Sequence, residues 1–273
     1  MAGERPQTYT GPMEQPRRWR TIWISDIHLG TRDCKAAFLL EFLKHNESDT
    51  LYLVGDVIDG WRLKTSWHYW DQRHNDVVQK ILRKARRGAR VILVPGNHDE
   101  AFRDFDGMHF GGVEVALEAV HETADGRRLL VVHGDQFDGI VRHAKAIALL
   151  GTWAYDVALR VNHWFNAGRR LIGLPYWSLS AYLKHKVKNA VSFIADYEHA
   201  LINEARRRGF DGVVCGHIHK AEIRMIDGML YCNDGDWVES LTALVEDHAG
   251  RLEIVEWKSI GAPRRPHTEA VAA

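Results

Sequence analysis

Five short polar signatures lie along the chain in a fixed order, each at the end of an apolar run. They are Asp26-Ile27-His28, Gly55-Asp56-Val57-Ile58-Asp59, Gly96-Asn97-His98-Asp99, His133-Gly134-Asp135 and Gly216-His217-Ile218-His219. Short apolar runs of this kind predict buried strands. Polar residues that follow the strands of an open α/β sheet meet at the carboxyl edge of that sheet. The signatures therefore favour a fold that gathers residues distant in sequence at one place.

The segments between the first three signatures predict alternating strands and helices. We expect strands over 21–25, 50–54 and 90–94, and helices over 35–45 and 67–87. Gly88 is expected to end the second helix, since glycine readily adopts the left-handed conformation found there. This order is typical of an α/β fold with a parallel sheet.

Beyond residue 100 the chain predicts mainly strands. Residues 113–121 and 127–132 flank Ala124-Asp125-Gly126, which is typical of a hairpin turn. Residues 211–215 predict a further strand that ends at the fifth signature. Short apolar runs over 222–257 predict an antiparallel meander.

Composition indicates a globular chain of 273 residues with 45% hydrophobic and 26% charged residues. We expect loose tails at 1–20 and 261–273 around one domain over 21–260.

The formal net charge is zero, so we expect no nucleic-acid partner. No apolar run approaches the roughly 18 residues that span a bilayer. The three cysteines are widely spaced, which indicates no disulfide framework and a cytoplasmic protein.

The signatures contain the side chains that divalent metal ions prefer as ligands: carboxylates, imidazoles and one amide. The candidate ligands are Asp26, His28, Asp56, Asn97, His133, His217 and His219. A carboxylate has two oxygens and can bridge two ions. Two ions about 3.5–4 Å apart activate a hydroxide between them for in-line attack on phosphorus. The pattern therefore predicts a phosphoryl hydrolase, with manganese, iron and zinc all compatible with this ligand set.

His98 is not needed as a ligand. It could donate a proton to a leaving group, or stabilise the transition state as a cation. Asp59 could orient its ring, as a carboxylate orients an active-site histidine.

With these motifs, the chain resembles the calcineurin-like metallophosphoesterases over residues 22–257, apart from one insertion. The resemblance implies a four-layer α/β/β/α sandwich of two mixed sheets. It implies that Asp26, His28, Asp56 and His219 hold one metal ion. Asp56, Asn97, His133 and His217 would hold the other, with Asp56 bridging, and His98 with Asp59 matches the catalytic pair of the family.

The chain also resembles the UDP-2,3-diacylglucosamine pyrophosphatases of lipid A synthesis in length, in the position of the insertion and in Gly235-Asp236-Trp237. These enzymes carry an arginine where this chain has His98. The resemblance implies two Mn²⁺ ions and cleavage of a pyrophosphate to UMP and 2,3-diacylglucosamine 1-phosphate. A lipid-linked nucleotide would then be the substrate.

The insertion over 139–208 predicts a mostly helical cap. Residues 139–200 carry eight Lys and Arg against three Asp and Glu, with many aromatic residues among them. Such a segment could take acyl chains and lie on the anionic surface of the inner membrane, and Arg169 and Arg170 are its candidate substrate contacts. The alternatives are a packed subdomain with solvated charges and a dimerisation surface, with the lipid cap favoured; the oligomeric state is not predicted.

Trp61 belongs to an aromatic cluster with Trp67, Tyr69 and Trp70, just after the second signature. It is a candidate substrate contact that could stack on a base, and it could equally pack on the nearby helix.

Three functions follow from these features. The first is a pyrophosphatase acting on a nucleotide-linked glycolipid. The second is a general phosphoesterase for a soluble phosphodiester or phosphomonoester. The third is a metal-free scaffold, which has no need for seven intact ligands.

Overall fold

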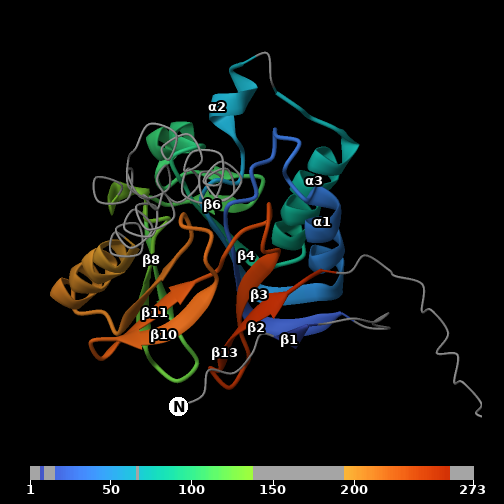
Figure 1. The fold of residues 1–273 in the computed structure, drawn as a ribbon. Coiled ribbons are helices and arrows are strands. Elements are labelled where there is room, and N and C mark those ends of the chain that lie inside the picture. The colour runs from blue at the N-terminus through green and yellow to red at the C-terminus, as the bar shows by residue number, and fades with distance from the viewer. Residues whose placement is uncertain (1–6, 9–15, 66–67, 138–193, 259–273) are drawn as a thin grey trace, which may run out of the picture.

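Two facing β-sheets form the body of the protein, with helices on their outer sides (Figure 1). The computed structural model describes residues 7–8, 16–65, 68–137 and 194–258. Both sheets are mixed, as expected for a metallophosphoesterase sandwich.

The larger sheet has eight strands. In spatial order they are β1 (Gln7–Thr8), β13 (Leu252–Glu256), β12 (Thr242–Glu246), β2 (Arg17–Ile24), β3 (Asn46–Val54), β4 (Arg90–Val94), β6 (Val113–Val115) and β5 (His109–Phe110). The smaller sheet has five strands. They are β10 (Glu222–Ile226), β11 (Met229–Asn233), β9 (Gly212–Cys215), β8 (Arg128–Val131) and β7 (Ala119–Glu122).

Helices cover the outer face of each sheet. The described helices include α1 (Ala36–His45), α2 (Gly60–Leu63) and α3 (Gln72–Arg86), and there are 3₁₀ turns η1 (Glu100–Phe105) and η2 (Asp135–Phe137). Residues 194–207 are also helical. In Figure 1, α1 and α3 lie on one side of the sandwich and the helix of 194–207 lies on the other.

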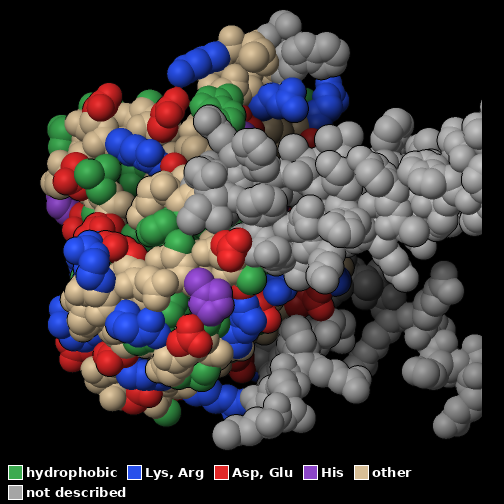
Figure 2. All heavy atoms as spheres, turned by 60° about the vertical axis from the view of Figure 1, so that its left-hand side comes forward, with side chains coloured by type: hydrophobic (Ala, Val, Ile, Leu, Met, Phe, Trp, Pro, Cys, Tyr) green, Lys and Arg blue, Asp and Glu red, His purple; other side chains and the backbone are tan. Residues whose placement is uncertain are grey.

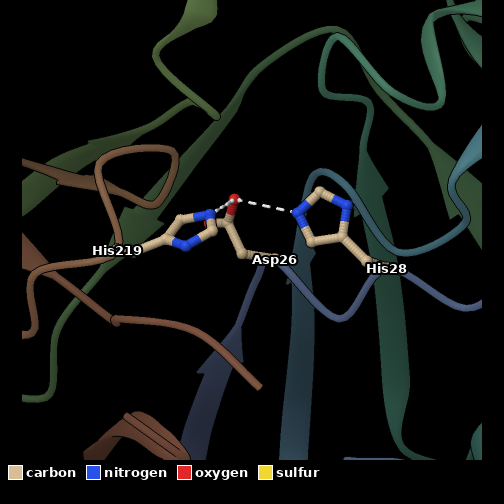
Figure 3. Close-up of side chains that lie close together, drawn as sticks. All are labelled: Asp26, His28 and His219. Carbon is tan, nitrogen blue, oxygen red and sulfur yellow. Dashed lines mark hydrogen bonds and ion pairs between the residues drawn. The ribbon is translucent and has the colours of Figure 1, made fainter. Parts of the chain in front are cut away.

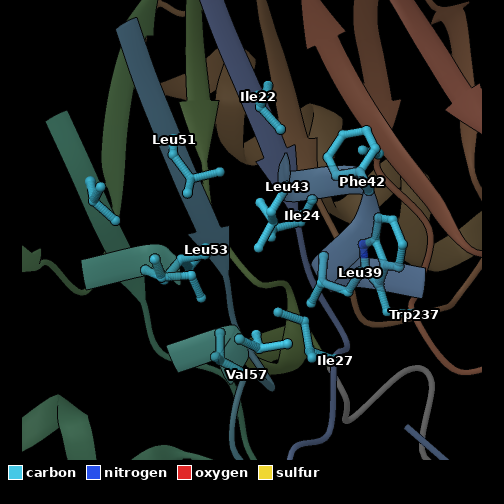
Figure 4. Packing of buried hydrophobic residues seen from close by; sticks show 14 of the residues in the cluster. Ile22, Ile24, Ile27, Leu39, Phe42, Leu43, Leu51, Leu53, Val57 and Trp237 are labelled. Atoms are coloured by element: carbon cyan, nitrogen blue, oxygen red, sulfur yellow. The ribbon is translucent and has the colours of Figure 1, made fainter. Parts of the chain in front are cut away.

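The two-residue period of the strands explains why both faces of each sheet are apolar. Ile22 and Ile24 of β2 pack with Leu39 and the other buried residues of α1 (Figure 4). Trp23, between them in sequence, points the opposite way and packs with residues of the smaller sheet such as Val214. Because neighbouring strand residues alternate between faces, a continuous apolar run supplies both the outer and the central core.

The centre of the larger sheet agrees with the predicted parallel order. β2 pairs with β3 and β3 with β4, all in parallel. Their carboxyl ends therefore lie side by side and carry the first three signatures. Gly88 follows α3 with φ of +99°, which confirms its predicted role in ending this helix.

The helix predicted over 67–87 begins later than expected. α3 starts at Gln72 because the Asp71 carboxylate accepts hydrogen bonds from the backbone N–H groups of Arg73 and His74. An aspartate in this position is a common helix N-cap.

The strand predicted over 113–121 is in fact two strands in different sheets. β6 pairs with β4 in the larger sheet, and β7 pairs with β8 in the smaller one. Hydrophobic alternation is the same in both, so the crossing between sheets leaves no signal in the pattern. The hairpin turn at Ala124-Asp125-Gly126 is confirmed, with Gly126 at φ +86°.

The meander predicted over 222–257 is also divided between the sheets. β10 and β11 form one antiparallel pair, and β11 continues the smaller sheet by parallel pairing with β9. β12 and β13 form a second antiparallel pair in the larger sheet. The segment 234–241 between the two pairs passes beneath the candidate site.

Described strands are present before residue 21, the predicted start of the domain. β2 starts at Arg17, and Gln7–Thr8 pairs with β13. At the other boundary, residues 194–207 lie within the predicted cap of 139–208, but Tyr197, Leu201 and Ala205 pack with the smaller sheet. This helix is therefore the outer layer of the sandwich. The rest of the predicted cap and the segment 261–273 lie outside the described residues.

All three cysteines are free, in agreement with the expectation of no disulfide framework, and all three are buried. No helix among the described residues is long and apolar enough to cross a membrane. On the face drawn in Figure 2, acidic and basic side chains are interspersed over the described residues.

Glu246 of β12 connects the two sheets through a buried ionic cluster. Its Oε2 lies 2.7 Å from Arg20 Nη1, 3.0 Å from Thr21 Oγ1 and 2.8 Å from His121 Nε2. Its Oε1 accepts a hydrogen bond from the N–H of Ala124. Burial favours the neutral acid, but these partners outweigh it and lower the pKa of Glu246 to about 2.

The stability that Glu246 contributes should depend on pH. Its pKa is depressed on folding, so the contribution is complete above the unfolded pKa of about 4.3 and is lost as the pH falls toward 2; the full effect is about 3 kcal/mol. We expect wild type and Glu246→Gln to differ most in free energy of unfolding near pH 6 and to converge by pH 2. Urea titrations across this range measure the difference, and a constant difference would contradict the assignment.

Candidate metal centre

The loops that follow β2, β3, β4, β8 and β9 converge and bring the five signatures together. Six of the seven predicted ligands fall into two groups whose donor atoms lie within 4.8 Å of one another. The first is Asp26, His28 and His219, and the second is Asp56, His133 and His217. The topology places the first three signatures on the larger sheet and the other two on the smaller one.

The first group is centred on Asp26 (Figure 3). Its Oδ1 lies 2.8 Å from Nε2 of His219 and 3.8 Å from Nε2 of His28, with one ring on each side of the carboxylate. Its Oδ2 accepts hydrogen bonds from the N–H of His217 at 2.7 Å and from the hydroxyl of Ser25 at 2.7 Å. One oxygen is thus held by the protein and the other faces the imidazoles.

The second group is centred on Asp56. Its Oδ1 lies 3.5 Å from Nε2 of His133, which is almost fully buried. Nδ1 of His133 lies 2.7 Å from the carbonyl oxygen of Val54. Nδ1 therefore carries the hydrogen and donates to that oxygen, so the lone pair of the neutral ring is on Nε2.

Asp56 also faces the first group. Its Oδ2 lies 3.8 Å from Nε2 of His28, while its Oδ1 faces His133. The two oxygens of one carboxylate thus point to two different sets of imidazoles. This is the arrangement that a bridging ligand requires.

Asn97 lies in the chain between Gly96, where an added Cβ would be 2.3 Å from Oδ1 of Asp56, and His98, whose N–H donates to that oxygen. Oδ1 of Asn97 is buried and has no hydrogen-bond partner among the described residues, and the same holds for Nε2 of His133. Buried polar atoms are usually satisfied. Two unsatisfied acceptors beside a buried carboxylate fit a divalent cation, because a cation can interact with their lone pairs in place of a hydrogen-bond donor.

Five of the seven predicted ligands have a left-handed backbone. Their φ values are +49° for Asp26, +53° for His28, +53° for Asp56, +69° for His217 and +54° for His219. Two other described non-glycine residues share this conformation, Asp227 and Leu241. Backbone strain of this kind clusters at functional sites, where it directs side chains. The residue types alone did not predict this backbone conformation.

All four glycines in the signatures, Gly55, Gly96, Gly134 and Gly216, are required by close packing, as two of them illustrate. A Cβ on Gly55, which has φ of +82°, would lie 2.3 Å from Nδ1 of His133. A Cβ on Gly216 would lie 2.3 Å from the Ser25 hydroxyl and 2.7 Å from Oδ2 of Asp26. Both glycines therefore allow neighbouring loops to approach the ligands.

His98 and Asp59 lie together, as the sequence suggested. Nδ1 of His98 is 3.1 Å from Oδ2 of Asp59, and its Nε2 is 3.9 Å from Oδ2 of Asp56. The same Asp59 oxygen lies 3.4 Å from Nδ1 of His28. Asp59 therefore orients a ligand as well as His98, which sequence reasoning did not indicate.

The charges of the site stabilise one another in the metal-free protein. Burial opposes ionisation of Asp26, but His219, His133 and His28 hold its pKa well below the usual range. Burial also opposes protonation of His133, but Asp56 and Asp26 raise its pKa to about 10. A cation bound here takes the place of these protons, so metal binding should release protons.

Asp99 is a structural member of the site that the sequence did not identify. Its buried carboxylate accepts hydrogen bonds from the N–H groups of Gly96 at 2.6 Å, Val57 at 2.8 Å, Asp56 at 3.3 Å and Ile58 at 3.4 Å. It ties the second signature to the third. Its place in the motif marked it as polar, but only the structure shows that backbone groups surround it.

The predicted substrate contacts are only partly described. The ring of Trp61 packs on that of His98 with a centroid separation of 4.2 Å, and Trp61 is 45% exposed. Its indole N–H lies 3.5 Å from Oε1 of Glu100. Arg169 and Arg170 lie outside the described residues.

The family model of the calcineurin-like phosphoesterases matches residues 20–221. Together with two mixed sheets and paired ligand groups at their edge, this match shows that the chain belongs to the calcineurin-like phosphoesterase family, whose members are metal-dependent hydrolases. A comparison with curated proteins found no match.

Several solved structures are similar to the chain at low identity. A Vps29 single mutant from Entamoeba histolytica is 14% identical, with 87% of this chain and 99% of that chain covered and a TM-score of 0.40. An archaeal phosphodiesterase is 12% identical, with coverage of 86% and 98% and a TM-score of 0.40. The phosphopantetheinyl hydrolase of Mycobacterium tuberculosis is 15% identical, with coverage of 80% and 90% and a TM-score of 0.36.

Replacing Gly55 by alanine should damage both the fold and the site. The substitution combines an unfavourable φ with a clash against His133, so we expect a loss of stability above the roughly 1 kcal/mol of backbone strain alone. Gly88→Ala is the matched control, because Gly88 has φ of +99° and no atom within 4 Å of an added Cβ. Chemical denaturation of both variants measures the difference, and equal losses would show that the contact with His133 is unimportant.

Proposed function

We propose that the chain hydrolyses the pyrophosphate of UDP-2,3-diacylglucosamine, releasing UMP and 2,3-diacylglucosamine 1-phosphate, with two Mn²⁺ ions as cofactors. The observation that carries the hydrolytic chemistry is Asp56, whose two oxygens face the two ligand groups. The choice of substrate rests on the resemblance to the lipid A pyrophosphatases and on the basic, aromatic insertion in the sequence.

Each ligand has a place in this proposal. Asp26, His28 and His219 would hold one ion and Asn97, His133 and His217 the other, with Asp56 between them. Once bound, the ions supply an activated water and offset the charge that develops on the phosphoryl oxygens.

His98 is placed to act on the leaving group. Its Nδ1 lies 3.1 Å from Oδ2 of Asp59, and its Nε2 lies on the side of Asp56, 3.9 Å from Oδ2. Burial alone would lower the pKa of His98, but Asp59 and Asp56 raise it. A protonated Nε2 can donate its proton to the departing oxygen, or stabilise the charge on it.

Trp61 would take the base of the nucleotide. Its indole packs on the ring of His98, and the residue as a whole is 45% exposed. An exposed indole beside the reaction centre suits stacking with uracil. The alternative role for Trp61, packing on the nearby helix, is disfavoured by this exposure.

The insertion would take the acyl chains. Each buried CH₂ contributes roughly 0.8 kcal/mol to binding, so acyl contacts would dominate affinity for a diacyl substrate. Its excess of Lys and Arg would suit a cytoplasmic protein that contacts the anionic surface of the inner membrane.

Asp56 and His98 should separate metal binding from proton transfer. Asp56→Ala should abolish hydrolysis and lower metal content, since the shared ligand is gone. His98→Ala should retain both metals and lose about 10²–10⁴-fold in kcat, the usual contribution of a positioned acid or base. Metal analysis with steady-state kinetics distinguishes them; loss of metal from His98→Ala would make His98 a ligand.

The substrate can be tested directly. Purified protein with Mn²⁺ should release UMP from UDP-2,3-diacylglucosamine in detergent micelles, and UDP-N-acetylglucosamine, which has the same pyrophosphate and no acyl chain at the 3-position, is the matched control. Turnover of a soluble phosphodiester or phosphomonoester with no UMP released would favour the general phosphoesterase. Asp56→Ala serves as the blank for contaminating hydrolases.

A further inference from the structure

A sixth polar segment, Asn233-Asp234-Gly235-Asp236-Trp237, lies under the metal centre at the end of β11. The amide of Asn233 donates a hydrogen bond to the carbonyl of Gly216 at 2.7 Å. The N–H of Trp237 donates to the carbonyl of Asp26 at 3.1 Å. This segment thus joins the first signature to the fifth, and its role in the chemistry is so far unassigned.

The Ser25 hydroxyl is at the centre of this junction. Its Oγ lies 2.6 Å from Oδ1 of Asp234, 2.7 Å from Oδ2 of Asp26 and 3.1 Å from the carbonyl oxygen of Gly235. Ser25 and both carboxyl groups are buried. Two carboxyl oxygens therefore approach one hydroxyl at short hydrogen-bonding distances, away from solvent.

Counting hydrogens shows that one of these carboxyl groups must be protonated. A serine hydroxyl has one hydrogen to donate and two lone pairs that accept. It can satisfy one of the two close oxygens as a donor. If the second carboxyl group were also ionised, its lone pairs would face those of the Ser25 hydroxyl oxygen at 2.6–2.7 Å and repel them. A carboxylic acid would instead donate a hydrogen bond to this hydroxyl.

The surroundings of the two groups decide which one carries the proton. Asp26 has a second donor on Oδ2, the N–H of His217, and an imidazole at 2.8 Å from Oδ1. Asp234 is fully buried, and its Oδ2 has no hydrogen-bond partner among the described residues. An ionised carboxylate is costly to bury with one oxygen unsatisfied, and a neutral acid costs much less. Burial and the nearby charge of Asp26 raise the pKa of Asp234, with Ser25 and His133 acting in the opposite direction.

We propose that Asp234 is a neutral carboxylic acid that donates a hydrogen bond to Ser25 and thereby directs the Ser25 hydroxyl to Asp26. Asp234 and Ser25 are then positioning residues. Their hydrogen bond and that of His217 N–H hold Oδ2 of Asp26, so Oδ1 is the oxygen presented to His28 and His219. The inference rests on Asp26 being a metal ligand and is independent of the substrate.

The protonation of Asp234 can be observed in the metal-free protein. The infrared difference spectrum between wild type and Asp234→Asn should contain a carboxylic acid C=O band that shifts in D₂O. Asp236→Asn is the control and should leave the band in place, because the Asp236 carboxylate accepts hydrogen bonds from the N–H groups of Val238, Glu239 and Ser240. Absence of a band specific to Asp234 would overturn the proposal.

Metal affinity tests the positioning role. Loss of a group that orients a metal ligand typically costs 10–100-fold in affinity, so we expect Ser25→Ala and Asp234→Ala to bind Mn²⁺ about that much more weakly by calorimetry. Asp234→Asn should bind as wild type, since its NH₂ group can donate to Ser25 in place of the acid. Circular dichroism on every variant checks that the fold is retained.

The results separate this inference from the proposed function. Weak binding by Asp234→Asn, equal to that of Asp234→Ala, would mean that the neutral donor is not what matters. Wild-type affinity in folded Ser25→Ala would remove the positioning role. Either result would leave the hydrolytic proposal standing, whereas failure of wild type to bind Mn²⁺ at all would contradict both.

Discussion

Two buried carboxylates, Asp26 and Asp56, lie close together inside this sandwich, and the surrounding structure is arranged to accommodate them. Neither is more than 2% exposed. Two like charges in a poorly solvated interior repel each other and lose their hydration, which is strongly unfavourable without compensation. Backbone donors supply part of it: the N–H of His217 to Asp26 and the N–H of His98 to Asp56. Imidazoles supply more of this compensation. In a hydrolase of this family, divalent cations supply the remaining positive charge.

This arrangement has a cost in backbone conformation. A left-handed backbone costs an ordinary L-residue roughly 1–2 kcal/mol, with Asp and Asn among the more tolerant. Five of the predicted ligands adopt it at once. The site cannot stabilise itself, so the apolar clusters on both faces of the larger sheet must offset the strain. That division explains why Ile24, Val54 and Val94, at the strand ends that precede the predicted ligands, are completely buried.

The order of strands and signatures was predictable because it depends on local patterns. A buried run followed by a polar signature predicts a ligand at a strand end, and β4 begins and ends at the predicted residues. The division of 113–121 between two sheets was not predictable, because both strands have the same alternation. The contacts of Asp99 and Asp234 were also not predictable from the sequence. Their partners are backbone groups and a serine far away in sequence, and only the tertiary structure brings these together.

The predicted ligands are divided between the two sheets, and this has a consequence for folding. Asp26, His28, Asp56 and Asn97 follow strands of the larger sheet, whereas His133, His217 and His219 follow strands of the smaller one. Neither sheet alone holds a complete ligand set for either ion. Ions held by these residues would therefore connect the two layers without a covalent bond, and ions that bind only the assembled sandwich would stabilise it by mass action. Release of the ions would weaken the attachment of one sheet to the other before it weakened either sheet.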